Sequence, residues 1–325
     1  CPWRSDPKKN HRCDFHRFRR IAGADKRHEE DTTGAFGVGF IAVYQITDSP
    51  ELYSGKWHWK MSPEQPEENR IAAWGISEHH GTRFVFPWAT DPNSPIRKGL
   101  NVPSISSEDK KRFLDEIALS APKAILFLKN IETIEIKQDG KLFKRIQRIN
   151  EGNTILIQDG DDTQLLYVFA GSFEEEGKRL RNRYPNTIED KRKENVRIAL
   201  ASGDMDKHGV FCATLPTQQA TYLPLHINAD FYTDSSRKHI SFEKNNEGEW
   251  NTRAVITAAE LLANNLTQLP KLLDHKALWQ LFEQIERVHK ESEKEASKGV
   301  FTHFWIQLKE HIENAPIVFS SQSEW

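Results

Sequence analysis

The chain has 325 residues, of which 37% are hydrophobic and 28% charged, so it is long enough for two domains with a sizeable core. Its 45 Lys and Arg residues nearly balance its 47 Asp and Glu residues, so no overall field favours nucleic acid or an anionic membrane as a partner. Three scattered cysteines exclude a disulfide framework, and no apolar run has the length of a membrane span. We therefore expect a cytoplasmic protein without a membrane partner.

The first 33 residues are dense in charge and mostly basic. Apolar residues at helical spacing predict a short amphipathic helix from Asp14 to about Ala22, and a polar loop from Gly23 through Thr33 follows. The Cys and His residues of this part have no standard zinc spacing, so we expect no metal site here. Nucleic-acid binding stays open as an alternative to a charged helix face, because the segment carries Lys8, Lys9, Arg12, Arg17, Arg19, Arg20, Lys26 and Arg27.

Three glycines then alternate with apolar residues, and an apolar run follows them without another glycine. The residues of this stretch are Gly34, Ala35, Phe36, Gly37, Val38, Gly39 and Phe40. A glycine loop that opens a helix exposes N–H groups at the positive end of the helix dipole, which suits a phosphate. The pattern predicts a phosphate-binding loop that continues into a helix over residues 39–48. A tight loop packed against a neighbouring strand is the alternative interpretation.

The segment from Gly34 to Asp48 resembles the second glycine box of the GHKL ATPases, the superfamily of gyrase, the heat-shock chaperone, histidine kinases and MutL. Its final residues, Val-Tyr-Gln-Ile-Thr-Asp, are most similar to the sacsin-type branch of that superfamily. The polar segment ahead of the glycines resembles the family's lid, in which a lysine precedes the box, and Lys26 is the matching position. The resemblance implies that Lys26 and the residues from Gly34 to Phe40 bind ATP. A solvated loop lysine is the other interpretation of Lys26.

Three strands with polar or Pro-rich connections are expected next, over Leu52 to Trp59, Arg70 to Ile76 and Thr82 to Trp88. The Gly81-Thr82 dipeptide resembles the Gly-Thr that opens a late strand of the GHKL sheet. This resemblance implies that the Thr82 hydroxyl helps to bind adenine, although a Thr at the start of a strand is most often structural.

A Pro- and Asn-containing stretch from Pro87 to Ser107 marks a plausible domain boundary, after which Ser107 to about Ser120 is expected as a helix. Asp139-Gly140 and Asp159-Gly160 predict hairpin turns. A further helix is expected over Glu174 to Arg183. The expected strands are Ala124–Lys129, Thr133–Gln138, Phe143–Ile149, Thr154–Gln158, Leu165–Phe169, Lys193–Leu200 and Val210–Leu215.

A third resemblance covers Ala213 to Thr217, Leu223 to Phe231, and Ser235 to Lys238. These segments are similar to the sacsin-type sequence that follows the ATPase domain, although the final turn lacks the Asn that precedes the basic pair in that family. In related chaperones an arginine of the second domain reaches the terminal phosphate, where its guanidinium stabilises charge. The resemblance implies this catalytic role for Arg237, and a plain surface arginine is the alternative.

A mostly apolar helix is expected to start with Glu249-Trp250-Asn251, an opening that resembles the sacsin-type pattern, and to end near Leu266. Charged amphipathic helices are expected from His275 to Asn314. We therefore predict an α/β (α+β) fold, with a GHKL-type two-layer α/β sandwich that lacks its first helix, a second α+β domain and a helical C-terminal segment. The predicted domains are residues 1–100, 101–248 and 249–325.

The resemblance implies an ATP-driven, chaperone-like conformational protein whose partners are ATP, Mg²⁺ and a protein client or further domains. The water-activating Glu, magnesium-binding Asn and adenine-reading Asp of the family are not found ahead of the glycine stretch. We therefore expect the magnesium ligand upstream of this chain, and almost no ATP hydrolysis by the chain alone. A degenerate nucleotide fold that serves as a protein-interaction module is the alternative function.

Overall fold

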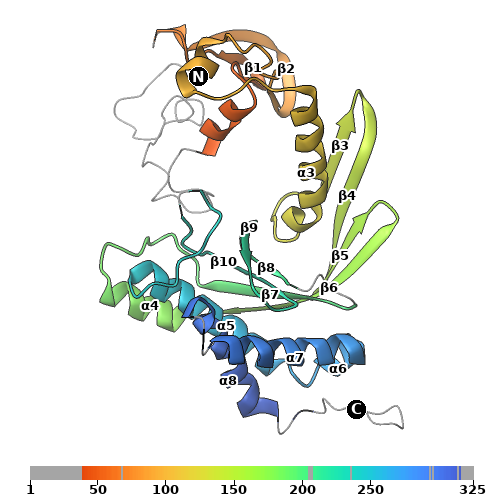
Figure 1. Ribbon diagram of the computed structural model, residues 1–325, viewed down its shortest axis with the longest axis vertical. Helices are drawn as coiled ribbons and strands as arrows, with labels where there is room; N and C mark the ends of the chain where they lie inside the picture. Colours follow the sequence, from red (N-terminus) through yellow and green to blue (C-terminus); the bar gives the residue numbers. More distant parts are fainter. Residues whose placement is uncertain are drawn as a thin grey trace. The chain divides into compact units, whose positions relative to one another are not determined.

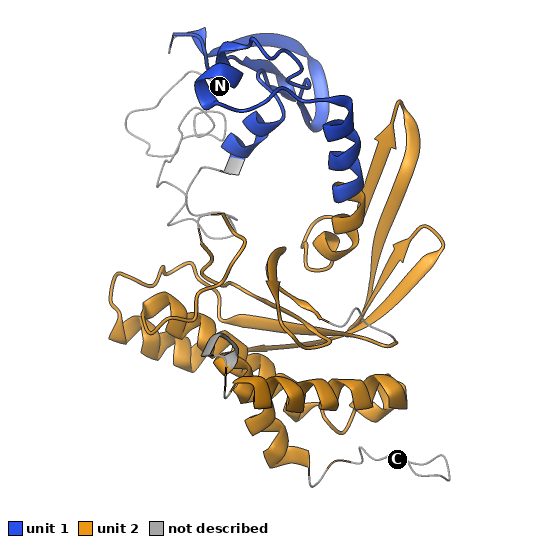
Figure 2. Cartoon of the chain, viewed as in Figure 1, with its two compact units in different colours: residues 1–116 blue, residues 117–325 orange. Residues whose placement is uncertain are grey.

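The computed structural model describes residues 39–66, 69–203, 208–234, 236–292, 294, 296–312 and 315. The helix predicted over residues 14–22 therefore lies outside the described residues. Two compact units are present, residues 1–116 and 117–325, and the division falls inside helix α3 (Ser107–Ile125) (Figure 2). The mixture of helices and open sheets confirms the predicted α+β class. The three-part domain division and the GHKL-type sandwich stay predictions.

The first unit contains the 3-10 helix η2 (Gly39–Gln45), strands β1 (Glu51–Met61) and β2 (Ile71–Val85), and the short helix α2 (Pro95–Leu100). Strands β1 and β2 form an antiparallel two-stranded sheet. The expectation of two separate strands over residues 70–76 and 82–88 is wrong, because β2 runs through the polar segment between them. His79 still pairs with Gly55, and a register shift absorbs the irregularity.

One face of this two-stranded sheet carries a small apolar cluster. Leu52, Trp59 and Met61 are buried in it, and Phe40 of η2 packs against them. The helix predicted over residues 39–48 is therefore present only as the shorter η2, whose start is fixed to the sheet by an aromatic side chain.

The second unit is built on an eight-stranded sheet with the order β3-β4-β5-β6-β7-β10-β8-β9 (Figure 1). All neighbouring strands pair antiparallel except β10 and β8, which are parallel. The strands are β3 (Thr133–Gln138), β4 (Lys141–Glu151), β5 (Thr154–Asp159), β6 (Asp162–Ser172), β7 (Asn195–Ala201), β8 (Val210–Ala213), β9 (Leu215–Ala220) and β10 (His226–Ala229).

Both predicted hairpin turns are present. Asp139 and Gly140 have φ angles of 50° and 76° and connect β3 to β4, while Gly160 has a φ of 63° between β5 and β6. Positive φ at both central residues gives the turn a twist that matches the flanking strands, which is why Asp-Gly is favoured there.

The strand predicted over Ala124–Lys129 is wrong. Helix α3 continues to Ile125, and the buried Arg148 of β4 donates hydrogen bonds to the carbonyls of Ile125, Leu126 and Leu128. An apolar run of this length fits a buried helix end as well as a strand. The guanidinium satisfies the carbonyls that the helix end leaves unpaired.

Helices cover one face of the sheet in the second unit, as Figure 1 shows for α5, α7 and α8. Helix α5 contacts β6, β7 and β10, and its buried side chains form the centre of the core. None of the described helices is long and apolar enough to cross a membrane. The helices are α4 (Glu174–Arg183), α5 (Asn246–Asn264), α6 (Leu269–Leu272), α7 (His275–Ser292), η4 (Ala296–Phe301) and α8 (Thr302–His311).

The thiol of Cys212 on β8 should be inert in the folded chain. The residue is 1% exposed, and burial raises the pKa of its thiol to about 12. Because the pKa of this thiol is higher in the folded than in the unfolded chain, the neutral buried thiol favours the folded state. This contribution to stability is complete below the unfolded pKa and is lost as pH rises through the folded pKa. With Cys1 and Cys13 replaced by serine, a thiol reagent at pH ~8 should label the protein only after unfolding. Fast labelling of the native protein would contradict this burial.

Candidate functional site

Only two residues of the predicted glycine loop lie in the described part of the chain. Gly39 and Phe40 begin η2, and the Phe40 ring lies 5.8 Å from that of Phe84 and 6.2 Å from that of Phe86. The Phe40 side chain therefore packs within the first unit. The remaining predicted residues lie outside the described residues: Lys26, Gly34, Ala35, Phe36, Gly37 and Val38.

Thr82 lies inside β2 and does not open a strand, which corrects the sequence expectation. The strand begins at Ile71, and Gly81 adopts a φ of 79° within it. The Thr82 hydroxyl is 3.1 Å from the Ser54 hydroxyl on β1, and both side chains lie at the surface of this sheet. The Gly-Thr pair thus marks an irregularity in a long strand, and glycine is favoured there because of its positive φ.

Arg97 of α2 is a residue that the sequence did not single out. Its side chain is 2% exposed, and its Nε donates to Asp48 Oδ1 at 2.7 Å. Its Nη atoms donate to the carbonyls of Tyr44, Gln45 and Thr47 at 2.5, 3.0 and 3.3 Å. All four partners lie at or just after the end of η2. A single guanidinium thus binds four of the five residues from Tyr44 to Asp48, and Ile46 is the exception.

Arg237 lies at the tip of a small hairpin in the second unit. Thr233 and Ile240 form an isolated antiparallel bridge, and the Asp234 N–H donates to the His239 carbonyl at 2.9 Å. Arg237 itself adopts a φ of 57°, and its N–H donates to the Asp234 carbonyl at 3.0 Å. The side chain of Arg237 is exposed. The hairpin therefore fixes the backbone and presents the guanidinium to solvent.

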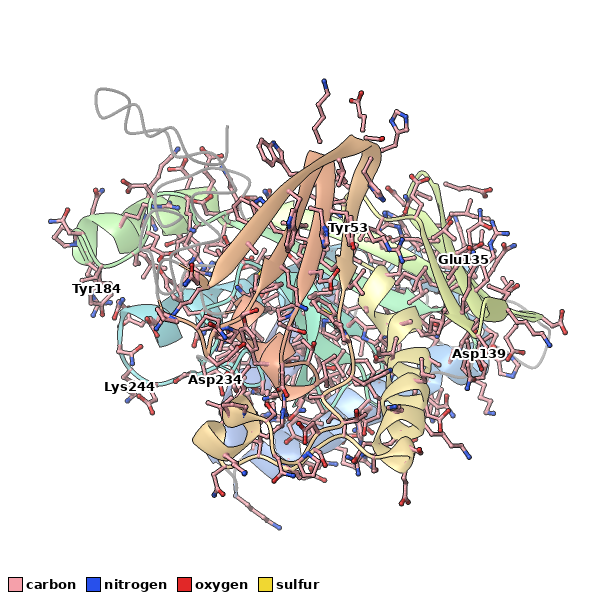
Figure 3. The ribbon with its side chains drawn as sticks, turned by 90° about the horizontal axis from the view of Figure 1, so that it is seen from above. Tyr53, Glu135, Asp139, Tyr184, Asp234 and Lys244 are labelled. Carbon is pink, nitrogen blue, oxygen red and sulfur yellow. The ribbon has the colours of Figure 1, made fainter. Side chains whose placement is uncertain are left out.

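The Asp234 carboxylate organises this hairpin (Asp234 is labelled in Figure 3). It accepts hydrogen bonds from the Ser236 hydroxyl and the Lys238 N–H, each at 2.9 Å, and from the His239 N–H at 3.4 Å. Desolvation raises the pKa of the Asp234 carboxyl, but these hydrogen bonds outweigh it and leave the pKa below its ordinary value. The contacts are therefore present at neutral pH and are lost as pH falls through the lowered pKa.

Strand β9 holds the hairpin from one side. The Gln218 N–H donates to the Lys238 carbonyl at 3.0 Å, and the Gln219 side-chain carbonyl accepts from the Ile240 N–H at 2.7 Å. Strand β9 starts with the Leu-Pro-Thr segment of the third resemblance. Gln218, which directly follows that segment, therefore contacts Lys238, the last residue of the third block.

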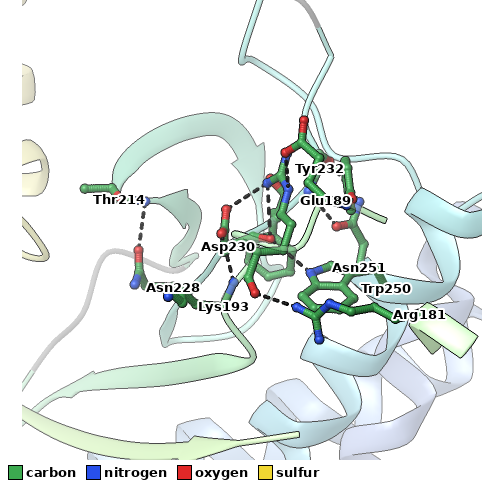
Figure 4. Close-up of polar contacts among 11 residues, drawn as sticks. Arg181, Glu189, Lys193, Thr214, Asn228, Asp230, Tyr232, Trp250 and Asn251 are labelled. Carbon is green, nitrogen blue, oxygen red and sulfur yellow. Dashed lines mark hydrogen bonds and ion pairs between the residues drawn. The ribbon is translucent and has the colours of Figure 1, made fainter. Parts of the chain in front are cut away.

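The start of α5 holds the hairpin from the other side (Figure 4). Asn251 is fully buried, and its amide accepts from the Tyr232 N–H and donates to the Tyr232 carbonyl, both at 2.8 Å. The same amide donates to the Ser241 carbonyl at 2.9 Å, and the Trp250 indole N–H donates to the Asp230 carbonyl at 3.1 Å. Asn251 thereby contacts the chain just before and just after the Arg237 hairpin.

A cation–π contact and an ion pair stiffen the segment that leads into the hairpin. The Arg192 guanidinium lies 3.8 Å from the centre of the Tyr232 ring and donates to Asp230 Oδ1 at 2.7 Å. The second carboxylate oxygen of Asp230 accepts from the Lys193 N–H at 3.1 Å. The positive charge of Arg192 and the negative charge of Asp230 thus compensate each other.

An exposed guanidinium on a fixed loop can bind a phosphate through paired N–H donors. This is the chemistry that the Arg237 hairpin offers. Among the described residues there is no group of three or more His, Cys, Asp or Glu side chains that could hold a metal ion.

Comparisons with known proteins agree with the resemblance found in the sequence. Residues 8–71 match the family model described as "Sacsin domain". The chain is also 20% identical to sacsin of Homo sapiens over an alignment of 258 residues that covers 69% of this chain. These two matches support a relationship of the sacsin type. The chain covers only 5% of the length of human sacsin, so the activity of that whole protein is not transferred to it here.

The sacsin-type resemblance is thus supported, while the wider GHKL assignment stays a prediction. The sacsin-type resemblance includes Trp250 and Asn251, but it predicts no role for them. A signal for Asp234 was present, because an Asp shortly before Ser and basic residues is typical of a side-chain-stabilised turn. Arg97 carried no local signal, because its partner Asp48 is 49 positions away.

Proposed function

We propose that this chain is part of an ATP-binding protein of the sacsin type, in which ATP drives a chaperone-like conformational change and is hydrolysed with Mg²⁺. Its partners would be ATP and a protein client or further domains, in the cytoplasm. The match to the sacsin family model supports this proposal, because residues 8–71 include the glycine stretch and η2.

The observation that carries the proposal is the support around Arg237. Three separated segments meet at one hairpin, and each contains or directly follows residues that resemble the sacsin type: β9, the residues that follow β10, and the second turn of α5. Asp234 shapes the turn and Asn251 holds its base. A plain surface arginine needs no such support, whereas a guanidinium that must meet a phosphate does.

In this proposal each residue has a chemical role. The Arg237 guanidinium would bind the terminal phosphate and stabilise the charge that develops during phosphoryl transfer. Backbone groups from Gly34 to Phe40 and the Lys26 ammonium would contact the phosphates, and the Thr82 hydroxyl would face the adenine. Bound Mg²⁺ would neutralise part of the phosphate charge.

The proposal is tested by measuring steady-state ATP hydrolysis. The sample is the natural polypeptide as the cell makes it. We expect a turnover that saturates with ATP, requires Mg²⁺ and is lost when a nonhydrolysable analogue competes. ATP binding without hydrolysis would instead favour the alternative, a nucleotide fold that acts as a protein-interaction module. Absence of both would overturn the ATP proposal.

A further inference from the structure

We propose that Arg97 is a positioning residue for nucleotide binding, which it serves by fixing η2 and hence the backbone of Gly39 and Phe40. The inference rests on the function proposed above. No sequence signal marks Arg97, and it lies outside the predicted set of site residues. Its buried contacts with the end of η2 carry the proposal.

Four consecutive carbonyls after the start of η2 have partners. Those of Tyr44, Gln45 and Thr47 accept from Arg97, and that of Ile46 accepts from the Ala89 N–H at 3.0 Å. The end of a helix leaves its last carbonyls without internal partners. Here α2 and the strand-like segment before it supply all four, so the end of η2 cannot shift without breaking several bonds.

Burying a guanidinium costs free energy, because the group stays charged and gives up its hydration. Asp48 neutralises it at 2.7 Å, and the carbonyls at the end of η2 add partial negative charge. Apolar packing of similar volume could stabilise the unit as well. Unlike apolar packing, a planar guanidinium with several N–H donors also fixes the direction of each carbonyl that it binds.

The position of the end of η2 determines the position of its start, because the helix has only 7 residues. At the start, the Phe40 ring packs against those of Phe84 and Phe86. Near the end, Thr47 forms a bridge with Trp88. Gly39 and Phe40 are therefore held between an aromatic contact and the Arg97 clamp, which we define as Arg97 with Asp48 and the carbonyls of Tyr44, Gln45 and Thr47.

The test uses Arg97→Lys, which keeps the charge but loses the fork, and Asp48→Asn, which keeps the shape but loses the counter-charge. Arg148→Lys is the matched control, because it makes the same change at another buried arginine that binds helix-end carbonyls, at the end of α3 and not of η2. Two quantities are measured in the polypeptide as the cell makes it, at a temperature where all variants are folded. They are the Kd for Mg·ATP and the hydrogen exchange of the Ile46 and Thr47 amides, which donate to Val43.

We expect Arg97→Lys and Asp48→Asn to weaken Mg·ATP binding about tenfold and to speed exchange at Ile46 and Thr47, with neither change in Arg148→Lys. Unchanged ATP affinity in both clamp variants would overturn the inference while leaving the proposed function intact. If the wild type binds no ATP, the proposed function fails, and the role in nucleotide binding is overturned with it. Unchanged exchange in the clamp variants would overturn the clamp itself.

Discussion

Replacing Arg237 by alanine should lower the kcat for ATP hydrolysis by about 10³-fold in the polypeptide as the cell makes it. The guanidinium binds the terminal phosphate of ATP and also stabilises the charge that develops in the transition state, so the loss should appear in kcat as well as in ATP affinity. The substitution adds no backbone strain, because Arg237 already places a Cβ at a φ of 57°. Steady-state kinetics of the two proteins measure the effect.

Lys238→Ala is the control for this prediction. Lys238 is the next exposed basic residue of the same hairpin, and its backbone contacts with Asp234 and Gln218 do not need its side chain. We expect its kcat to stay within about twofold of the wild type, which is a difference of less than about 0.5 kcal/mol. Equal losses in the two variants would indicate a general field effect and would remove the specific role of Arg237.

Replacing Asn251 by leucine should destabilise the second unit by about 3 kcal/mol and lower its melting temperature by roughly 10 °C. The substitution leaves the Tyr232 N–H and the Tyr232 and Ser241 carbonyls without the amide that now pairs them. Buried groups that lose a partner carry the full cost of desolvation. Thermal denaturation followed by circular dichroism measures the change.

Asn265→Leu, at the residue that caps the C-terminal end of the same helix, provides the comparison. The Asn265 amide donates to the Leu261 carbonyl at 2.8 Å near the end of α5, where the side chain is only partly buried. We expect a loss below about 1 kcal/mol. If both substitutions had the same effect, the base of the Arg237 hairpin would not depend on Asn251 as described. The Arg237→Ala variant should keep the wild-type melting temperature, because its exposed side chain supports no other element.

The hairpins of the second unit were predictable because each depends on neighbouring residues. Asp139-Gly140 tolerates the positive φ that a two-residue turn requires, and the flanking residues alternate at strand period. The helix α4 was predicted with its observed bounds, from Glu174 to Arg183. Contacts between residues that are close in the sequence determine these elements, and such contacts can be predicted from the sequence alone.

Elements that depend on distant partners were predicted less well. The residues after Pro122 are predicted as a strand, because no feature of the run itself indicates that Arg148 binds its carbonyls at the end of a helix. Strand β2 was divided in two, because the polar residues around His79 look like a connection although they face solvent on a continuous strand. Polar residues are compatible with the exposed face of a sheet.

The candidate site divides in the same way. The resemblance drew attention to Arg237, Trp250 and Asn251 separately, but the sequence gave no reason for them to occur together. The hydrogen bonds of Asn251 and the turn shaped by Asp234 supply that reason. Arg97 was missed, because a buried guanidinium is recognised by its surroundings and not by its neighbours along the chain.

Equilibrium binding of Mg·ATP by the polypeptide as the cell makes it, measured by titration calorimetry with ADP as the comparison, tests the central claim most directly. We predict saturable binding of ATP and weaker binding of ADP, because ADP lacks the phosphate assigned to Arg237. The Arg237→Ala variant should bind the two nucleotides with similar affinity. The absence of saturable ATP binding in the wild type at millimolar nucleotide would contradict the account.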